Sequence, residues 1–194
     1  MKKTLLSLLL LSGLILVSCD EDVPEAEDAP EMITKVELLF SPKSGGAPIV
    51  VTAVDNDGAG PNNLEPSGQI ELQGGESYDL FVSFENTINE EDITEEVKDE
   101  SDEHQIFYGF TEGIFESPTG AGNLIKDDGQ VNYLDEDANG LPLGLITSWV
   151  VGNSSGFGSF RLVLKHQPDG IKSTTSGASD GETDVDVSFV LSIQ

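Results

Sequence analysis

Apolar and polar side chains alternate regularly along several short stretches of this chain. The alternation is clearest near the C-terminal end, where apolar residues occupy every second position: Val185, Val187, Phe189, Leu191 and Ile193. Residues 34–40, 78–84 and 160–166 repeat the pattern. Successive side chains of a strand point to opposite faces, so this period predicts strands with one buried face. Strands of this kind are typical of antiparallel sheets that cover a core on one side.

Turn-forming clusters of Gly, Pro, Asn and Asp separate weaker runs of the same kind, at residues 48–54, 69–73, 104–110, 130–134 and 143–151. Residues 90–103 differ, because they suit a short helix with Asn89 as its N-cap. We therefore expect an all-β fold: an antiparallel, immunoglobulin-like β-sandwich of about eight or nine strands with one short helical crossover. A closed barrel is the alternative. Residues 168–183, rich in Gly, Ser and Thr, are expected to form a long flexible hairpin loop.

The N-terminus indicates export and a lipid anchor. Lys2 and Lys3 precede an apolar run that is too short to span a bilayer. The run ends in Leu-Val-Ser-Cys at residues 16–19, which resembles the lipobox of bacterial lipoproteins. We expect residues 1–18 to be a lipoprotein signal peptide and Cys19 to be lipidated. Residues 19–31 would then form an acidic, disordered tether, and residues 32–194 a single β-sandwich domain attached to the membrane through the lipid.

The charge of the chain excludes several classes of partner. Loss of the signal lysines would leave 7 basic residues against 36 acidic ones, a formal charge of −29. Such a field repels nucleic-acid phosphates, attracts cations, and favours a soluble monomer. Cys19 is the only cysteine, so the exported domain can form no internal disulfide. Nucleic-acid binding is therefore not expected, whereas binding of a cation is compatible with the charge.

Two histidines suggest a divalent metal site. His104 is in phase with the apolar positions at the start of one expected strand, and His166 is in phase with those at the end of another. The start of one strand lies beside the end of its antiparallel neighbour, so the two imidazoles can meet at one rim of the sandwich. Glu103 and Asp184 are expected near that rim. Two imidazoles and a carboxylate suit Zn²⁺ or another late first-row ion, although two unrelated histidines would give the same sequence pattern.

Residues 135–140 suggest a second cation site. Asp135, Asp137 and Asn139, followed by a glycine, match the first half of a calcium-binding loop. The bidentate Glu that completes such a loop is missing, because Ile146 stands at its position. The alternative is a tight Asn-Gly turn between strands.

No catalytic constellation is expected, and we interpret the chain as a non-enzymatic protein. Residues 152–156 (GNSSG) match the G-x-S-x-G nucleophile motif, but that motif needs a strand-to-helix turn and acid and histidine partners downstream. Here it lies between two strand patterns with no helix after it. A hairpin loop is therefore expected at these residues.

Four segments together resemble a family of small Bacteroidetes-type lipoproteins: SDEHQIFY, DEDANGLPLG, LKHQPDG and SDGETDVDVSFVLSIQ. Some members are described as type 1 periplasmic binding folds, which need alternating strands and helices rather than the pattern found here. The resemblance implies an outer-membrane lipoprotein that assists a receptor in the uptake of a nutrient or divalent metal. The acidic stretch after Cys19 resembles one that accompanies export to the cell surface, which favours surface display over a periplasm-facing anchor. The alternative function is a structural or adhesive surface module that binds protein or glycan, steadied by calcium.

Overall fold

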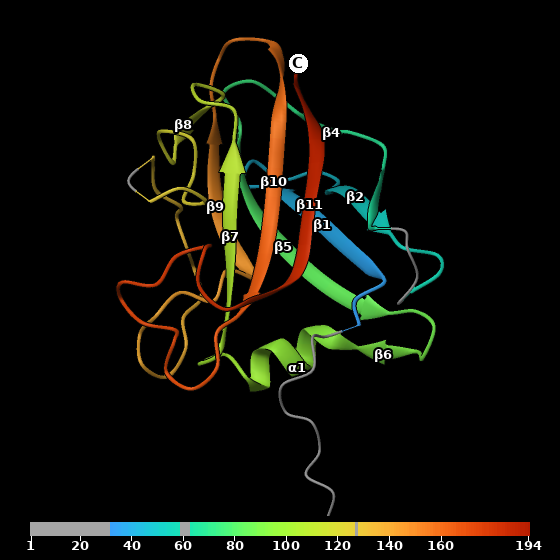
Figure 1. Ribbon diagram of the computed structural model, residues 1–194. Helices are drawn as coiled ribbons and strands as arrows, with labels where there is room; N and C mark the ends of the chain where they lie inside the picture. Colours follow the sequence, from blue (N-terminus) through green and yellow to red (C-terminus); the bar gives the residue numbers. More distant parts are fainter. Residues whose placement is uncertain (1–31, 59–62, 127) are drawn as a thin grey trace, which may run out of the picture.

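The computed structural model describes residues 32–58, 63–126 and 128–194, which form two β-sheets packed face to face (Figure 1). Strands dominate, and the single helix of this part of the chain, α1, is short. The all-β sandwich expected from the alternation is therefore confirmed. None of the described helical residues forms a segment long and apolar enough to cross a membrane. The expected signal peptide, Cys19 and the acidic tether lie outside the described residues.

The larger sheet has the strand order β3-β2-β1-β5-β9-β8, with the two-residue β6 paired to β5 off this path. All of its pairings are antiparallel. Its strands are β1 (Lys35–Pro42), β2 (Ile49–Val54), β3 (Glu65–Ser67), β5 (Ser77–Asn86), β6 (Glu91–Asp92), β8 (Phe115–Ser117) and β9 (Ile146–Val151).

The smaller sheet has the order β4-β11-β10-β7. Its strands are β4 (Ile70–Leu72), β7 (His104–Phe110), β10 (Gly156–His166) and β11 (Glu182–Ile193). The long strands β7, β10 and β11 pair antiparallel, and β4 pairs parallel with the end of β11. In Figure 1 these three long strands stand side by side, with the start of β7 and the end of β10 at the same end of the molecule as α1.

The apolar faces of both sheets meet in one hydrophobic core. At its centre the Trp149 ring lies 4.8–5.6 Å from four other aromatic rings: Tyr108, Phe110, Phe115 and Phe160. The buried indole N–H of Trp149 donates to Thr147 Oγ1 at 2.8 Å, so no polar group is left unpaired there. Every second side chain of a strand points into this core, and this explains why apolar and polar residues alternate in the sequence.

The helix α1 (Ile93–Asp99) begins later than the sequence suggested. Its N-cap is Asp92, whose carboxylate accepts the Thr94 N–H at 3.0 Å, and not Asn89. Asn89 instead belongs to the turn between β5 and β6, where its N–H donates to Asn86 Oδ1 at 3.2 Å. The expected helix over residues 90–103 was therefore too long at both ends. The two apolar positions of α1, Ile93 and Val97, are buried against the core.

The described residues contain eleven strands rather than about eight or nine, because three strands of only two or three residues were not expected: β3, β6 and β8. Residues 130–134 were expected to form a strand, and this is wrong. Their β-pairing is limited to an isolated bridge from Tyr133 to Thr147, beside single backbone hydrogen bonds such as that of the Leu134 N–H to the Ile146 carbonyl at 2.9 Å. A strand of two or three residues is too short to show a repeated alternation of apolar and polar residues in the sequence.

The loop between β10 and β11 connects these strands as expected, but part of it is packed rather than solvated. Gln167 and Lys172 are buried. The Gln167 side-chain amide donates to the carbonyls of Gly177 and Asp180, both at 3.1 Å. These contacts fold the loop back on itself near the end of the sandwich where α1 lies.

Candidate metal centre

The two histidines meet at one rim of the smaller sheet. His104 is the first residue of β7 and His166 the last of β10, and the two are directly paired across the strands. Their rings stack with a centroid distance of 4.7 Å and an interplanar angle of 8°. The side chains are 0% and 5% exposed. Both point inward because they continue the apolar faces of their strands, as the phase of the sequence pattern indicated.

Three carboxylates surround the imidazoles. Glu103 Oε2 lies 3.3 Å from His166 Nε2, and Asp184 Oδ2 lies 3.7 Å from His104 Nε2. Glu100 Oε2 lies 3.8 Å from His104 Nδ1. The structure therefore brings together all four residues that the sequence suggested for a metal site, and it adds Glu100.

Glu100, His104 and His166 are the described residues whose ligand atoms come closest to a shared ion, since one atom from each lies within 4.8 Å of the others. Ligand atoms around a tetrahedral zinc ion are about 3.3 Å apart, so the three groups must contract around it. The lone pairs of parallel rings also point in parallel directions, and a ring rotation is needed for them to converge. Sequence reasoning missed Glu100, although it stands four residues before His104 at the end of a helical segment.

Burial lowers the pKa of His104 to about 4, and the neighbouring His166 and Lys172 add to this effect against an opposing contribution from the Glu100 carbonyl. The imidazole of His104 is therefore neutral at pH 7. Neutral imidazole is the form that binds a metal ion, because a protonated ring has no free lone pair.

The carboxylates of the expected calcium turn have other partners. Asp135 accepts the N–H groups of Gly144 and Ile146, at 2.9 and 3.1 Å. Asp137 accepts the N–H groups of Asn139 and Leu141 through Oδ1, and its Oδ2 lies 3.0 Å from the Lys172 ammonium.

The segment 137–140 forms a tight turn, in which the Gly140 N–H donates to the Asp137 carbonyl at 3.0 Å. Gly140 has a φ of 77°, the left-handed conformation that glycine adopts without strain. A tight turn is therefore present, as the alternative expected, but Gly140 is the one residue of the Asn-Gly pair that has a positive φ. The ammonium of Lys172 supplies the positive charge beside Asp137.

We expect the melting temperature of the protein to be the same in millimolar calcium and in excess EGTA, because Lys172 already balances Asp137. Differential scanning calorimetry of the full-length protein measures this directly. A rise of several degrees with calcium, absent in an Asp137→Asn variant, would restore the calcium site.

The segment 152–156 joins β9 of the larger sheet to β10 of the smaller one. It therefore crosses between the sheets, and the hairpin loop expected there is wrong. A strand leads out of it and no helix follows, which differs from the strand-to-helix turn that the G-x-S-x-G nucleophile requires.

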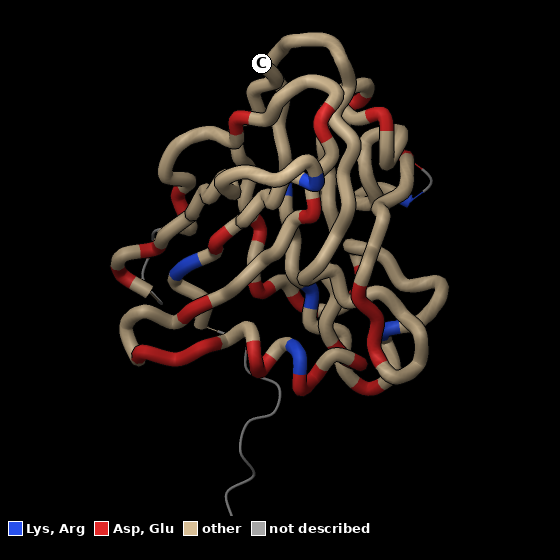
Figure 2. Tube along the Cα trace, turned by 180° about the vertical axis from the view of Figure 1, so that it is seen from behind, with Lys and Arg blue, Asp and Glu red and all other residues tan. Residues whose placement is uncertain are grey.

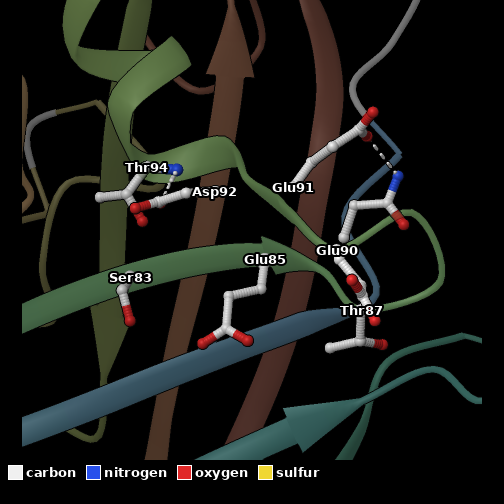
Figure 3. Close-up of a pocket in the computed structure, with 8 residues that line it drawn as sticks. Ser83, Glu85, Thr87, Glu90, Glu91, Asp92 and Thr94 are labelled. Atoms are coloured by element: carbon white, nitrogen blue, oxygen red, sulfur yellow. Dashed lines mark hydrogen bonds between the residues drawn. The ribbon is translucent and has the colours of Figure 1, made fainter.

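A second acidic region lines a surface cleft of about 580 Å³ beside the β5–β6 turn (Figure 3). Three of its four acidic side chains have structural partners: Glu85 binds the Lys35 ammonium at 2.9 Å, Glu91 accepts from the Asn86 amide, and Asp92 caps α1. These carboxylates hold the turn and the start of the helix together. The fourth acidic side chain that lines the cleft is that of Glu90.

Similarity to known proteins gives no guide to the chemistry of this site. No protein-family model matches the chain, and no match is found among curated proteins or solved structures. The likeness to a lipoprotein family seen in the four segments of the sequence stays a prediction.

Proposed function

We propose that this protein is a non-enzymatic, membrane-anchored binding module that captures a late first-row divalent ion, such as Zn²⁺, as an accessory to uptake at the outer membrane. The observation that carries the proposal is the stacked pair of buried histidines, His104 and His166, with Glu100 in reach. Imidazole nitrogen suits zinc, copper and nickel, whereas calcium and magnesium prefer oxygen ligands alone.

The charge distribution supports capture of a cation. Nine acidic residues and a single lysine occupy residues 90–103, which include α1 and lead into His104. Asp and Glu gather along this end of the molecule, at the lower edge of Figure 2. A rim with charge of one sign raises the local concentration of counter-ions and speeds their binding.

The proposal predicts one strong zinc site that depends on both histidines. Isothermal titration calorimetry of the full-length protein should give one equivalent of Zn²⁺ per chain. The double variant His104→Phe/His166→Phe keeps two flat rings but removes the nitrogen ligands, so we expect zinc affinity to fall more than about 100-fold.

Asp186→Asn is the matched control for the loss of acidic surface. Asp186 lies on the outer face of β11, where it pairs with Arg161, and its loss should leave zinc binding unchanged. Equal zinc affinity of the parent and the double phenylalanine variant would refute the site.

A second candidate function is a surface module that binds another macromolecule, and one observation favours it. An apolar row runs across the outer face of four neighbouring strands, where Leu39 pairs with Val50 and Phe81, and Phe81 pairs with Ile146. Val50 and Phe81 are 49% and 42% exposed. A parent protein that takes up no zinc would favour this function over metal capture.

A further inference from the structure

We propose that Asp184 and Glu103 hold His104 and His166 with the proton on Nε2, so that both rings bind the ion through Nδ1. This inference rests on the proposed function and specifies which histidine nitrogen atoms bind the ion. Asp184 and Glu103 then act as positioning residues, while Glu100 is the carboxylate that touches the ion. Metal-binding imidazoles almost always donate their second N–H to a carboxylate, a carbonyl or water, which fixes the ring and its tautomer.

The first argument is the place of Asp184 in β11. Leu164 pairs with Val185 and Lys165 with Thr183, so the register shifts and Asp184 is the extra residue of a β-bulge. Simple alternation would put Asp184 on the outer face with Asp186. Instead its side chain is 0% exposed and faces His104. Bulges re-aim single side chains and are over-represented beside functional sites.

The second argument concerns the proton of His104. Its Nδ1 lies 3.3 Å from the Glu100 carbonyl, which would suit a donor. That carbonyl already accepts the backbone N–H groups of Glu103 and His104, at 2.9 and 3.2 Å. A carbonyl oxygen has two lone pairs, so it is a poor acceptor for a third donor. At Nε2 the neighbour is the Asp184 carboxylate, which attracts an N–H and repels a lone pair.

The third argument is that His166 has the same arrangement. Its Nε2 lies 3.3 Å from Glu103 Oε2, within reach of an N–H donor. The Glu103 carbonyl also accepts the Gln167 N–H at 2.6 Å, so the backbone of this residue is tied to the one that follows His166. Each imidazole thus has its own carboxylate beside Nε2.

The three carboxylates therefore have different roles: Asp184 and Glu103 orient the rings, and Glu100 binds the ion. With both Nε2 atoms protonated, the free lone pairs are those of Nδ1. In His104 this atom faces Glu100 Oε2, 3.8 Å away, where two acceptors stand opposite one another. A cation placed between them removes that repulsion. Glu100, His104 and His166 each have a ligand atom, for the histidines one of the two ring nitrogens, within 4.8 Å of the others.

The tautomers are read directly from the ion-free, ¹⁵N-labelled full-length protein by long-range ¹H–¹⁵N NMR. We expect both histidines to carry the proton on Nε2. Addition of ¹¹³Cd²⁺ should then produce metal coupling at Nδ1 of both rings. A proton on Nδ1 of either histidine, or coupling at Nε2, overturns the inference. Absence of any bound ion refutes the proposed function instead, so the two failures are distinguishable.

Asp184→Asn supplies the second test. We expect zinc affinity to fall about 10- to 100-fold, the range for loss of a residue that orients a metal ligand. We also expect His104, but not His166, to populate the Nδ1–H tautomer. Asp186→Asn removes an equal charge two residues away on the outer face, and it should change neither the zinc affinity nor the tautomer of His104. Unchanged zinc affinity and tautomer in a folded Asp184→Asn protein would contradict the positioning role.

Discussion

Replacement of Lys172 by Ala is expected to lower the free energy of unfolding by about 3–5 kcal/mol. The Lys172 ammonium lies 3.0 Å from Asp137 Oδ2 and donates to the Ser101 carbonyl at 2.6 Å, with both side chains of the ion pair 0% exposed. Without the lysine, the Asp137 carboxylate remains in the interior with its charge unbalanced. A charge that loses its partner cannot recover its hydration there, and that loss dominates the expected effect. Urea unfolding followed by tryptophan fluorescence measures it.

Lys98→Ala is the matched control, because Lys98 pairs with Glu95 at 2.7 Å on the surface of α1, where the two side chains are 48% and 67% exposed. Its effect should stay below about 1 kcal/mol. Lys172→Met combined with Asp137→Asn should recover part of the loss, because the amide oxygen can still accept the N–H groups of the turn. Equal effects of Lys172→Ala and Lys98→Ala would show that the buried pair is not important for stability.

The sandwich and the burial of the two histidines could be predicted from the sequence, because both follow from the alternation of buried and exposed side chains along a strand. Alternation told which face of each strand is buried, and His104 and His166 continue those buried faces. Antiparallel order then places the start of β7 beside the end of β10. The sequence left open whether these two strands are neighbours, and the structure supplies that pairing for two side chains 62 residues apart.

The carboxylates around the histidines were harder to assign. Asp184 lies on a strand whose alternation puts it outside, and the bulge that turns it inward has no signal in the order of apolar residues. Glu100 is the C-cap that follows α1, whereas the sequence pattern predicts a helix that continues through it. Its place near His104 depends on where the helix ends, and helix ends are the least visible part of a helical pattern.

The loop between β10 and β11 shows the same limit. Its Gly, Ser and Thr content suggested a solvated hairpin, but Lys172 reaches Ser101, 71 residues earlier in the chain, and Asp137. Contacts made by one long side chain with two distant segments produce no repeating pattern of residue types in the sequence. The same limit holds for the turn at Asp137, because the positive charge beside its carboxylate comes from that distant lysine.

The stability of the ion-free protein is expected to fall by about 3 kcal/mol between pH 7 and pH 4 on account of His104. The pKa of this histidine is about 4 in the folded protein, where burial is the main cause, against an ordinary value of 6.5. As the pH falls through this window, the unfolded chain takes up a proton that the native protein does not. Protons therefore favour unfolding, and the effect levels off below pH 4, where both states are protonated.

The contribution of His104 is isolated by comparison with His104→Phe, since carboxylates titrate in both proteins and their effects cancel in the difference. Unfolding by urea in the presence of a chelator, at steps between pH 7 and pH 4, should show a steeper loss of stability in the parent than in the variant. The difference should grow with each step below about pH 6.5. Parallel curves would mean that His104 is protonated as readily in the folded protein as in the unfolded chain. They would also remove the reason for expecting an imidazole at this rim that stays neutral, and so ready to bind an ion, below pH 6.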